Sequence, residues 1–168
     1  MLRTLARLLR ALNSETHPTQ IAGAACLAVI AGLTPLWTLH NLVVLLLVLV
    51  LRVNLSTFLV VWALFSGIAY LADPLFHALG LSLLTAEPLH GLWTAFYATV
   101  PGRLSRFNNT VVLGSLVTAL ALAAILFPLA VYLIRQYRSH LLSYVRRSRL
   151  MTFLKASKLY RLYAGLQD

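Results

Sequence analysis

The sequence predicts an all-α integral membrane protein, and three observations carry that prediction: its composition, its long uncharged runs and the placement of its charges. Of 168 residues, 60% are apolar and only 11% are Asp, Glu, Lys or Arg, whereas soluble domains average about 25% charged residues. The net charge is +10, and most basic residues stand outside the uncharged runs. With a single cysteine as well, these features exclude a soluble enzyme, a disordered chain and a secreted disulfide scaffold.

The length fits a single membrane domain over residues 1–168, in which we expect three regions. Residues 1–16 form the first, an amphipathic helix lying in the membrane interface, with arginines on one stripe and leucines opposite. An ordinary first helix of a bundle is the alternative. Residues 17–134 are the membrane-embedded core and 135–168 a basic cytoplasmic tail. The arginines expected to contact anionic lipid from the first region are Arg3, Arg7 and Arg10.

The uncharged run 21–51 is too long for one straight span. As a helix it would measure about 46 Å, against a hydrocarbon core of about 30 Å. Gly32, Thr34 and Pro35 predict a break, because proline lacks an amide hydrogen and disfavours helix in the residue before it. We favour a re-entrant hairpin over 20–51 that returns to the side it entered. The alternative is an interfacial helix followed by one span.

Two full transmembrane helices are expected after the hairpin, at 55–72 and 111–134. Asp73 and Pro74 are predicted to end the first of them. The stretch 75–102 is cut by glycines and prolines, which favours short interfacial helices rich in aromatic residues. Pro128 is expected to kink the second span.

Charge placement predicts that both termini are cytoplasmic. The tail carries eight basic residues from Arg135 to Arg161 and no acid before Asp168, at spacings that indicate two basic amphipathic helices. An even number of crossings then places Arg52 inside, and Arg103 and Arg106 outside. Within the tail, anionic-lipid contacts are expected from Arg146, Arg147 and Arg149.

Polar groups in or beside the apolar runs are candidate contacts to lipid headgroups or to a partner, since such groups are costly in lipid. A structural role, as snorkelling or helix-capping side chains, is the alternative. These residues are His40, Asn41, Arg52, Asn54 and Asp73. Small residues at helical spacing permit close helix packing, within the chain or with a partner. They are Ala22, Gly23, Ala25, Gly114, Ser115 and Thr118.

Chemistry for catalysis is missing from the sequence. Cys26 has no predicted base beside it, the five histidines are scattered, and the two mid-chain acids form no pair. We therefore expect no enzyme activity, no metal and no cofactor. The basic tail has no recognisable nucleic-acid-binding fold, so nucleic acid is not an expected partner.

Most of residues 17–134 resembles a family of small bacterial membrane proteins known as domain of unknown function 2062. The first matching features are Pro18, Ile21, Ala22 and Gly23 at membrane entry, then Gly32 with Pro35. Further matches are Arg52 with Asn54, Asp73-Pro74 followed by Leu79-Gly80, and the run Arg106 to Ser115. The resemblance implies an inner-membrane location and a role around the cell envelope, and it implies no catalytic residue.

Together these lines predict a non-catalytic subunit of the bacterial inner membrane that acts in envelope lipid or glycan handling. Its expected partners are anionic membrane lipids and a larger envelope membrane protein or further copies of itself. The alternative is a small transporter or channel protomer built around the broken hairpin. An intramembrane enzyme remains conceivable only if a partner supplies catalytic residues.

Overall fold

The computed structural model describes residues 17–141, and within them every regular element is helical. In chain order these elements are α2 (Pro18–Leu33), α3 (Leu39–Val50), α4 (Leu55–Thr85), the 3₁₀ helix η1 (Glu87–Leu89), α5 (His90–Tyr97), α6 (Val100–Ser105), α7 (Thr110–Gln136) and the π-helical turn η2 (Tyr137–Leu141). The all-α prediction is therefore confirmed for the part of the chain described.

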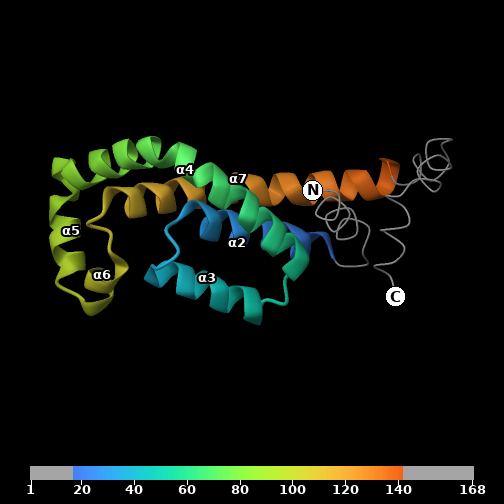
Figure 1. The fold of residues 1–168 in the computed structure, drawn as a ribbon, viewed down its shortest axis with the longest axis horizontal. Coiled ribbons are helices and arrows are strands. Elements are labelled where there is room, and N and C mark those ends of the chain that lie inside the picture. The colour runs from blue at the N-terminus through green and yellow to red at the C-terminus, as the bar shows by residue number, and fades with distance from the viewer. Residues whose placement is uncertain (1–16, 142–168) are drawn as a thin grey trace.

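The two long helices α4 and α7 run antiparallel along the molecule, and α2 packs against both (Figure 1). α2 runs in the direction of α4, while α3 turns back and runs alongside. The start of α2, the α3–α4 turn and the end of α7 all lie toward one end of the molecule (Figure 1). The short helices α5 and α6 close the opposite end. We call α5 and α6 together the cap.

Helix starts follow local sequence signals. Pro18 occupies the first turn of α2, where its missing amide hydrogen does no harm. Asn54 caps α4 by accepting a hydrogen bond from the Thr57 amide at 2.9 Å. Asn109 caps α7 in the same way, accepting from Val111 at 2.9 Å and from Val112 at 3.2 Å. Each cap satisfies an amide that the helix itself leaves unpaired.

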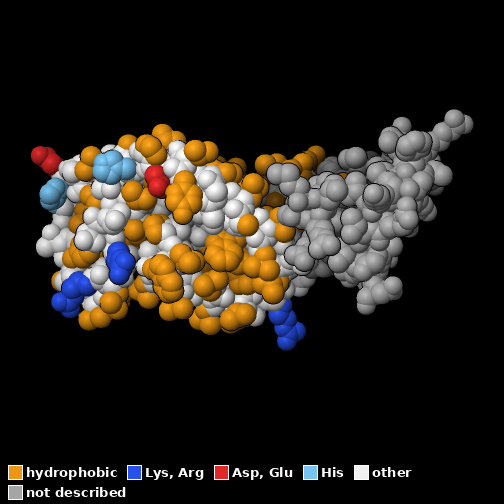
Figure 2. All heavy atoms as spheres, viewed as in Figure 1, with side chains coloured by type: hydrophobic (Ala, Val, Ile, Leu, Met, Phe, Trp, Pro, Cys, Tyr) orange, Lys and Arg blue, Asp and Glu red, His pale blue; other side chains and the backbone are white. Residues whose placement is uncertain are grey.

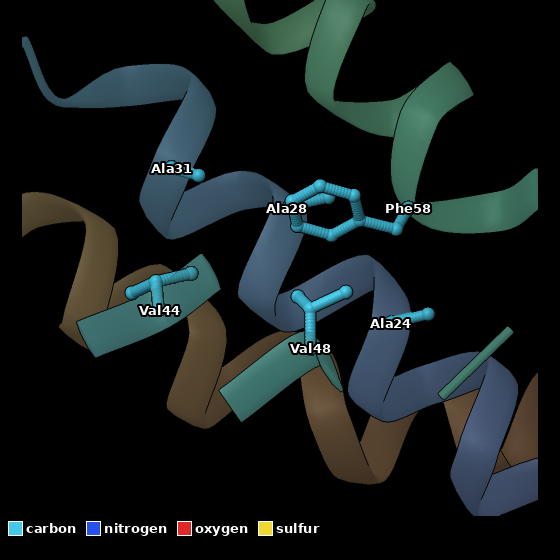
Figure 3. Packing of buried hydrophobic residues seen from close by; sticks show 6 residues of the cluster. All are labelled: Ala24, Ala28, Ala31, Val44, Val48 and Phe58. Carbon is cyan, nitrogen blue, oxygen red and sulfur yellow. The ribbon is translucent and has the colours of Figure 1, made fainter. Parts of the chain in front are cut away.

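The hairpin of α2 and α3 is held by a core of small side chains. Ala24, Ala28 and Ala31 form the face of α2 that meets the neighbouring helices (Figure 3). Phe58 of α4 lies beside Ala28, and Val44 and Val48 reach across from α3. Alanine lets helix axes approach closely, so this face packs tightly with little side-chain volume. Figure 3 therefore shows where the hairpin joins α4. 

One prediction about the second helix is wrong: Asp73 and Pro74 do not end it. α4 continues through Pro74 to Thr85, so residues 75–85 belong to the long helix and only 87–105 form short ones. Pro74 lies on an exposed face, where the ring can be accommodated by a slight bend. Beyond it, Phe76 and Gly80 are buried against α7, and this packing outweighs the lost hydrogen bond.

The predicted break at 32–35 and the second span at 111–134 agree with the structure. α2 ends at Leu33, α3 begins at Leu39, and α7 covers 110–136, passing through Pro128. The helix therefore extends slightly past the expected boundary at 134. The interfacial helix at 1–16 with Arg3, Arg7 and Arg10 lies outside the described residues, as do Arg146, Arg147 and Arg149 of the tail.

Two helical stretches are long and apolar enough to cross a membrane: Leu55–Thr85 and Thr110–Ser139. Only 11% and 17% of their most apolar windows are buried, whereas the core helix of a soluble protein would be mostly buried. Figure 2 shows the consequence, with apolar side chains spread over much of the visible surface.

Candidate functional site at the hairpin tip

The break between α2 and α3 is stabilised by a buried polar pair, Thr34 and Asn41. The Thr34 hydroxyl lies 2.7 Å from the Ile30 carbonyl oxygen and 3.1 Å from Asn41 Oδ1. Asn41 is only 1% exposed, and its amide donates to the Pro35 carbonyl oxygen at 3.0 Å. The carbonyls freed by the broken helix thus find partners within the tip itself, as buried polar groups must.

His40 connects the hairpin tip to the cap. Its Nε2 lies 3.0 Å from the Thr38 hydroxyl, which donates to the Pro35 carbonyl at 3.0 Å, while its Nδ1 is buried without a hydrogen-bond partner. The His40 ring centroid is 6.2 Å from that of Phe107, which stacks on Phe96 at 5.6 Å. Three rings in contact thereby join the start of α3 to α5 and to the loop after α6.

The aromatic row continues to Tyr97, whose ring centroid lies 5.8 Å from that of Phe96. Burial raises the pKa of the Tyr97 hydroxyl, and the neighbouring Asn108 backbone lowers it to a lesser extent. That hydroxyl is buried without a hydrogen bond of good geometry. Tyr97 therefore stays protonated at neutral pH and serves as packing between the cap and the loop.

The outermost part of the tip is apolar and open. Pro35, Leu36 and Trp37 are all exposed, and Trp37 is 85% exposed. An indole this open to the surroundings has no packing role within the described chain. The tip therefore combines an interior of hydrogen-bonded polar groups with an exposed apolar end.

The other predicted polar residues do not gather at the tip. Arg52 is exposed in the α3–α4 turn, at a φ of 48°, and Asn54 is the α4 cap described above. Asp73 lies part-buried inside α4, so its expected role as a helix-ending residue is wrong. No ion pair joins Arg52 to Asp73 among the described residues, in line with the roughly 27 Å that 18 helical residues would place between them.

The predicted small residues divide into two groups. Ala22, Gly114 and Ser115 are buried within the chain, so they serve internal packing. Gly23, Ala25 and Thr118 are part-exposed, and the Thr118 hydroxyl donates to the Gly114 carbonyl at 2.8 Å. A Cβ on Gly114 would overlap the carbonyl oxygen of Phe76 in α4. The backbones of α4 and α7 therefore touch at this glycine.

Sequence reasoning missed Gly80 as a packing residue and treated it as a helix interruption. A Cβ on Gly80 would overlap the Thr110 carbonyl oxygen, which mirrors the contact of Gly114 with Phe76. The available signal was the four-residue spacing shared by Phe76 with Gly80 and by Thr110 with Gly114. Sequence reasoning also missed Thr38 and Phe107, for which no local pattern exists.

The fold defines a helical protein with two helices of membrane-spanning length and a broken helical hairpin packed on them. The chain belongs to the bacterial family described as "uncharacterized protein conserved in bacteria (DUF2062)", whose profile matches residues 2–142. A relative described as "uncharacterized protein" from Treponema pallidum (strain Nichols) is 30% identical over 141 residues, covering 84% of this chain and 87% of its own length. No solved structure gives a significant match.

Proposed function

We propose that this protein is a multi-pass protein of the bacterial inner membrane in which α2 and α3 form a re-entrant hairpin. α2 has 16 residues and α3 has 12, so they measure about 24 Å and 18 Å and each falls short of the roughly 30 Å hydrocarbon core. Both open ends of the hairpin lie at the end of the molecule where α7 finishes (Figure 1). Together these support a hairpin that enters and leaves by one face, with both termini cytoplasmic.

The face of α3 turned away from α2 supports an apolar environment around the hairpin. Only Asn41, Val44 and Val48 of α3 are buried, and they form the one stripe that meets α2. The rest of α3 is a nearly continuous apolar surface that soluble proteins rarely leave uncovered. The exposed side chains are Leu39, Leu42, Val43, Leu45, Leu46, Leu47, Leu49 and Val50.

We further propose that the protein is a non-catalytic subunit in envelope lipid or glycan handling that helps a larger membrane protein engage the bilayer. The single observation behind this is the apolar face of α3, which no other described element covers. A half-depth helix with such a face disturbs one leaflet and offers lipid or a partner helix a large contact. Among the described residues no group of three or more His, Cys, Asp or Glu side chains could hold a metal ion.

The alternative is a transporter or channel protomer, with the break at 32–35 as its substrate site. The polar groups at the tip, Thr34 and Asn41, already satisfy one another and the loop carbonyls. They leave few free partners for a solute, which favours the subunit role.

The hairpin is tested by the depth of Trp37 in a full-length variant carrying Trp62→Phe and Trp93→Phe. In vesicles with bromine atoms at defined acyl positions, we expect the deepest bromines to quench Trp37 most strongly. Cysteines placed at residues 20 and 52 in a Cys26→Ser background should both react with reagent from the cytoplasmic side. Labelling of these two positions from opposite faces would contradict the re-entrant hairpin.

The subunit role is tested by purification from the native membrane in mild detergent. Co-purification of one larger envelope membrane protein in stoichiometric amount is the expected result. In a comparison variant, Leu42→Ser and Leu46→Ser change the exposed face of α3. This variant should keep its fold but no longer co-purify with the partner. A stable homo-oligomer that passes solute in liposomes would instead establish the transporter.

A further inference from the structure

Two arginines lie in the cap and directly after it, on the side of the membrane where the proposed topology makes basic residues least expected. Arg103 lies in the last turn of α6, Arg106 is the residue directly after the helix, and both are exposed. In the proposed topology they face away from the cytoplasm, against the bias that governs short loops. This inference rests on that topology.

No acidic residue within 17–139 forms an ion pair with either arginine, so their charge is not neutralised inside the described chain. Arg106 also holds a left-handed backbone, with φ at 58°. That conformation costs a non-glycine residue about 1–2 kcal/mol.

Two exposed apolar side chains lie on α6 next to Arg103. Val100 is 60% exposed and Leu104 is 59% exposed, and both lie on α6 beside Arg103. Figure 2 shows two basic patches among apolar side chains in the part of the molecule that α6 occupies, next to the start of α3. Guanidinium groups next to open apolar side chains match an anionic lipid, whose phosphate and acyl chain meet at the membrane surface.

The segment that carries these groups is packed against its neighbours. Gly102 packs against the Phe96 backbone, where a Cβ would overlap the Phe96 carbonyl oxygen. The Thr99 hydroxyl caps α6 by accepting from the Gly102 amide at 3.1 Å. Phe107, between His40 and Phe96, ties the segment to the hairpin tip. 

We infer that Arg103 and Arg106 bind the phosphate of an anionic lipid from the leaflet opposite the cytoplasm, with Val100 and Leu104 against its acyl chain. A planar guanidinium pairs with two phosphate oxygens at once, which a lysine ammonium cannot do. The chemistry recognised is a phosphate group, and the flanking apolar side chains select its lipid-borne form over the free ion.

The test uses the full-length protein in neutral detergent with a fluorophore on Asn108→Cys in a Cys26→Ser background. Asn108 is exposed and two residues from Arg106, so the probe reports on the cap and not on the basic tail. The probes added are dihexanoyl phosphatidic acid, dihexanoyl phosphatidylcholine and inorganic phosphate. We expect saturable binding of the phosphatidic acid, and at least tenfold weaker binding of the other two.

The variants separate a site from general charge attraction. Arg103→Gln with Arg106→Gln should weaken phosphatidic acid binding at least tenfold, and the corresponding lysine pair should also bind more weakly than wild type. The control pair Arg135→Gln with Arg138→Gln removes the same charge at the other end of α7 and should change affinity less than twofold. Equal losses in both glutamine pairs, or equal affinity for inorganic phosphate, would overturn the inference.

Unchanged helical circular dichroism establishes that each variant is folded; Arg103, Arg106 and Arg135 are exposed, and Arg138 is part-buried. Lipid binding in detergent is measured separately from the topology and from co-purification, so each of the three results can fail without the others. A protein that passes those tests but binds no phosphatidic acid keeps its proposed function and loses only the lipid site.

Discussion

At the scale of single residues, stability depends on a few positions where an added methyl group or a lost hydrogen bond destabilises the fold. Gly80 and Gly114 bring two helix backbones into contact, and Asn41 satisfies the carbonyls that the break leaves free. Arg52 differs from these residues, because it has a strained backbone in an exposed turn and its side chain is itself exposed.

Gly114→Ala should destabilise the protein by about 2 kcal/mol or more, since the new methyl group overlaps the Phe76 carbonyl and α4 must move away from α7. The measurement is thermal unfolding in detergent. Gly67→Ala is the matched control, because a Cβ there meets no atom within 4 Å. It should leave stability unchanged or raise it by up to about 1 kcal/mol through helix propensity. Similar losses in both variants would refute the close contact.

Asn41→Leu should cost about 1–3 kcal/mol, because it leaves the Thr34 hydroxyl and the Pro35 carbonyl with one partner fewer in a buried setting. The same unfolding assay measures the effect. Leu42→Ala next to it alters a side chain that is 66% exposed and should change stability little. If Asn41→Leu is as stable as wild type, the polar pair does not hold the break.

Arg52→Gly should raise stability by about 1 kcal/mol, since glycine accepts a positive φ without strain. We expect Arg52→Gly and Arg52→Lys both to impair complementation of a deletion strain at unchanged protein level. A lysine can snorkel to headgroups, but its ammonium cannot form the bidentate hydrogen bonds that a guanidinium makes with a phosphate or with partner carbonyls. Full complementation by the lysine variant would mean that Arg52 contributes only a positive charge that orients the chain in the membrane.

At the scale of elements, α4 shows how packing overrides a local signal. An Asp-Pro pair favours a helix end, yet α4 passes through Pro74 and is then buried at Phe76 and Gly80. With 31 residues, α4 measures about 46 Å, which is longer than the roughly 30 Å thickness of a hydrocarbon core.

Pro74→Ala should therefore be tolerated and should stabilise α4 by up to about 3 kcal/mol, because it restores an amide donor inside a continuous helix. Thermal unfolding measures the gain, and circular dichroism should show no added helix. An increase in helical content on substitution would mean that the helix ends at Asp73 after all. Pro128→Ala provides the parallel comparison inside α7.

At the scale of the whole molecule, the two ends have different characters. One end gathers the start of α2, the turn with Arg52 and the end of α7, while the other carries the cap (Figure 1). The hairpin reaches only part of the way between them because α2 and α3 are much shorter than α4 and α7. A molecule built this way has an exposed apolar surface on α3 and a basic and apolar surface at the cap.

The sequence by itself determined the helical class, the break near Pro35 and the second long apolar helix, because hydrophobic run length and proline chemistry act locally. The order of its short motifs also predicted the family to which the chain belongs. What only the tertiary structure decided are the contacts between distant segments: Gly80 on Thr110, Gly114 on Phe76, and His40 beside Phe107. The continuation of α4 past Pro74 was also decided only by the tertiary structure. Such features depend on which surfaces meet after folding, and burial against α7 outweighs a preference confined to neighbouring residues.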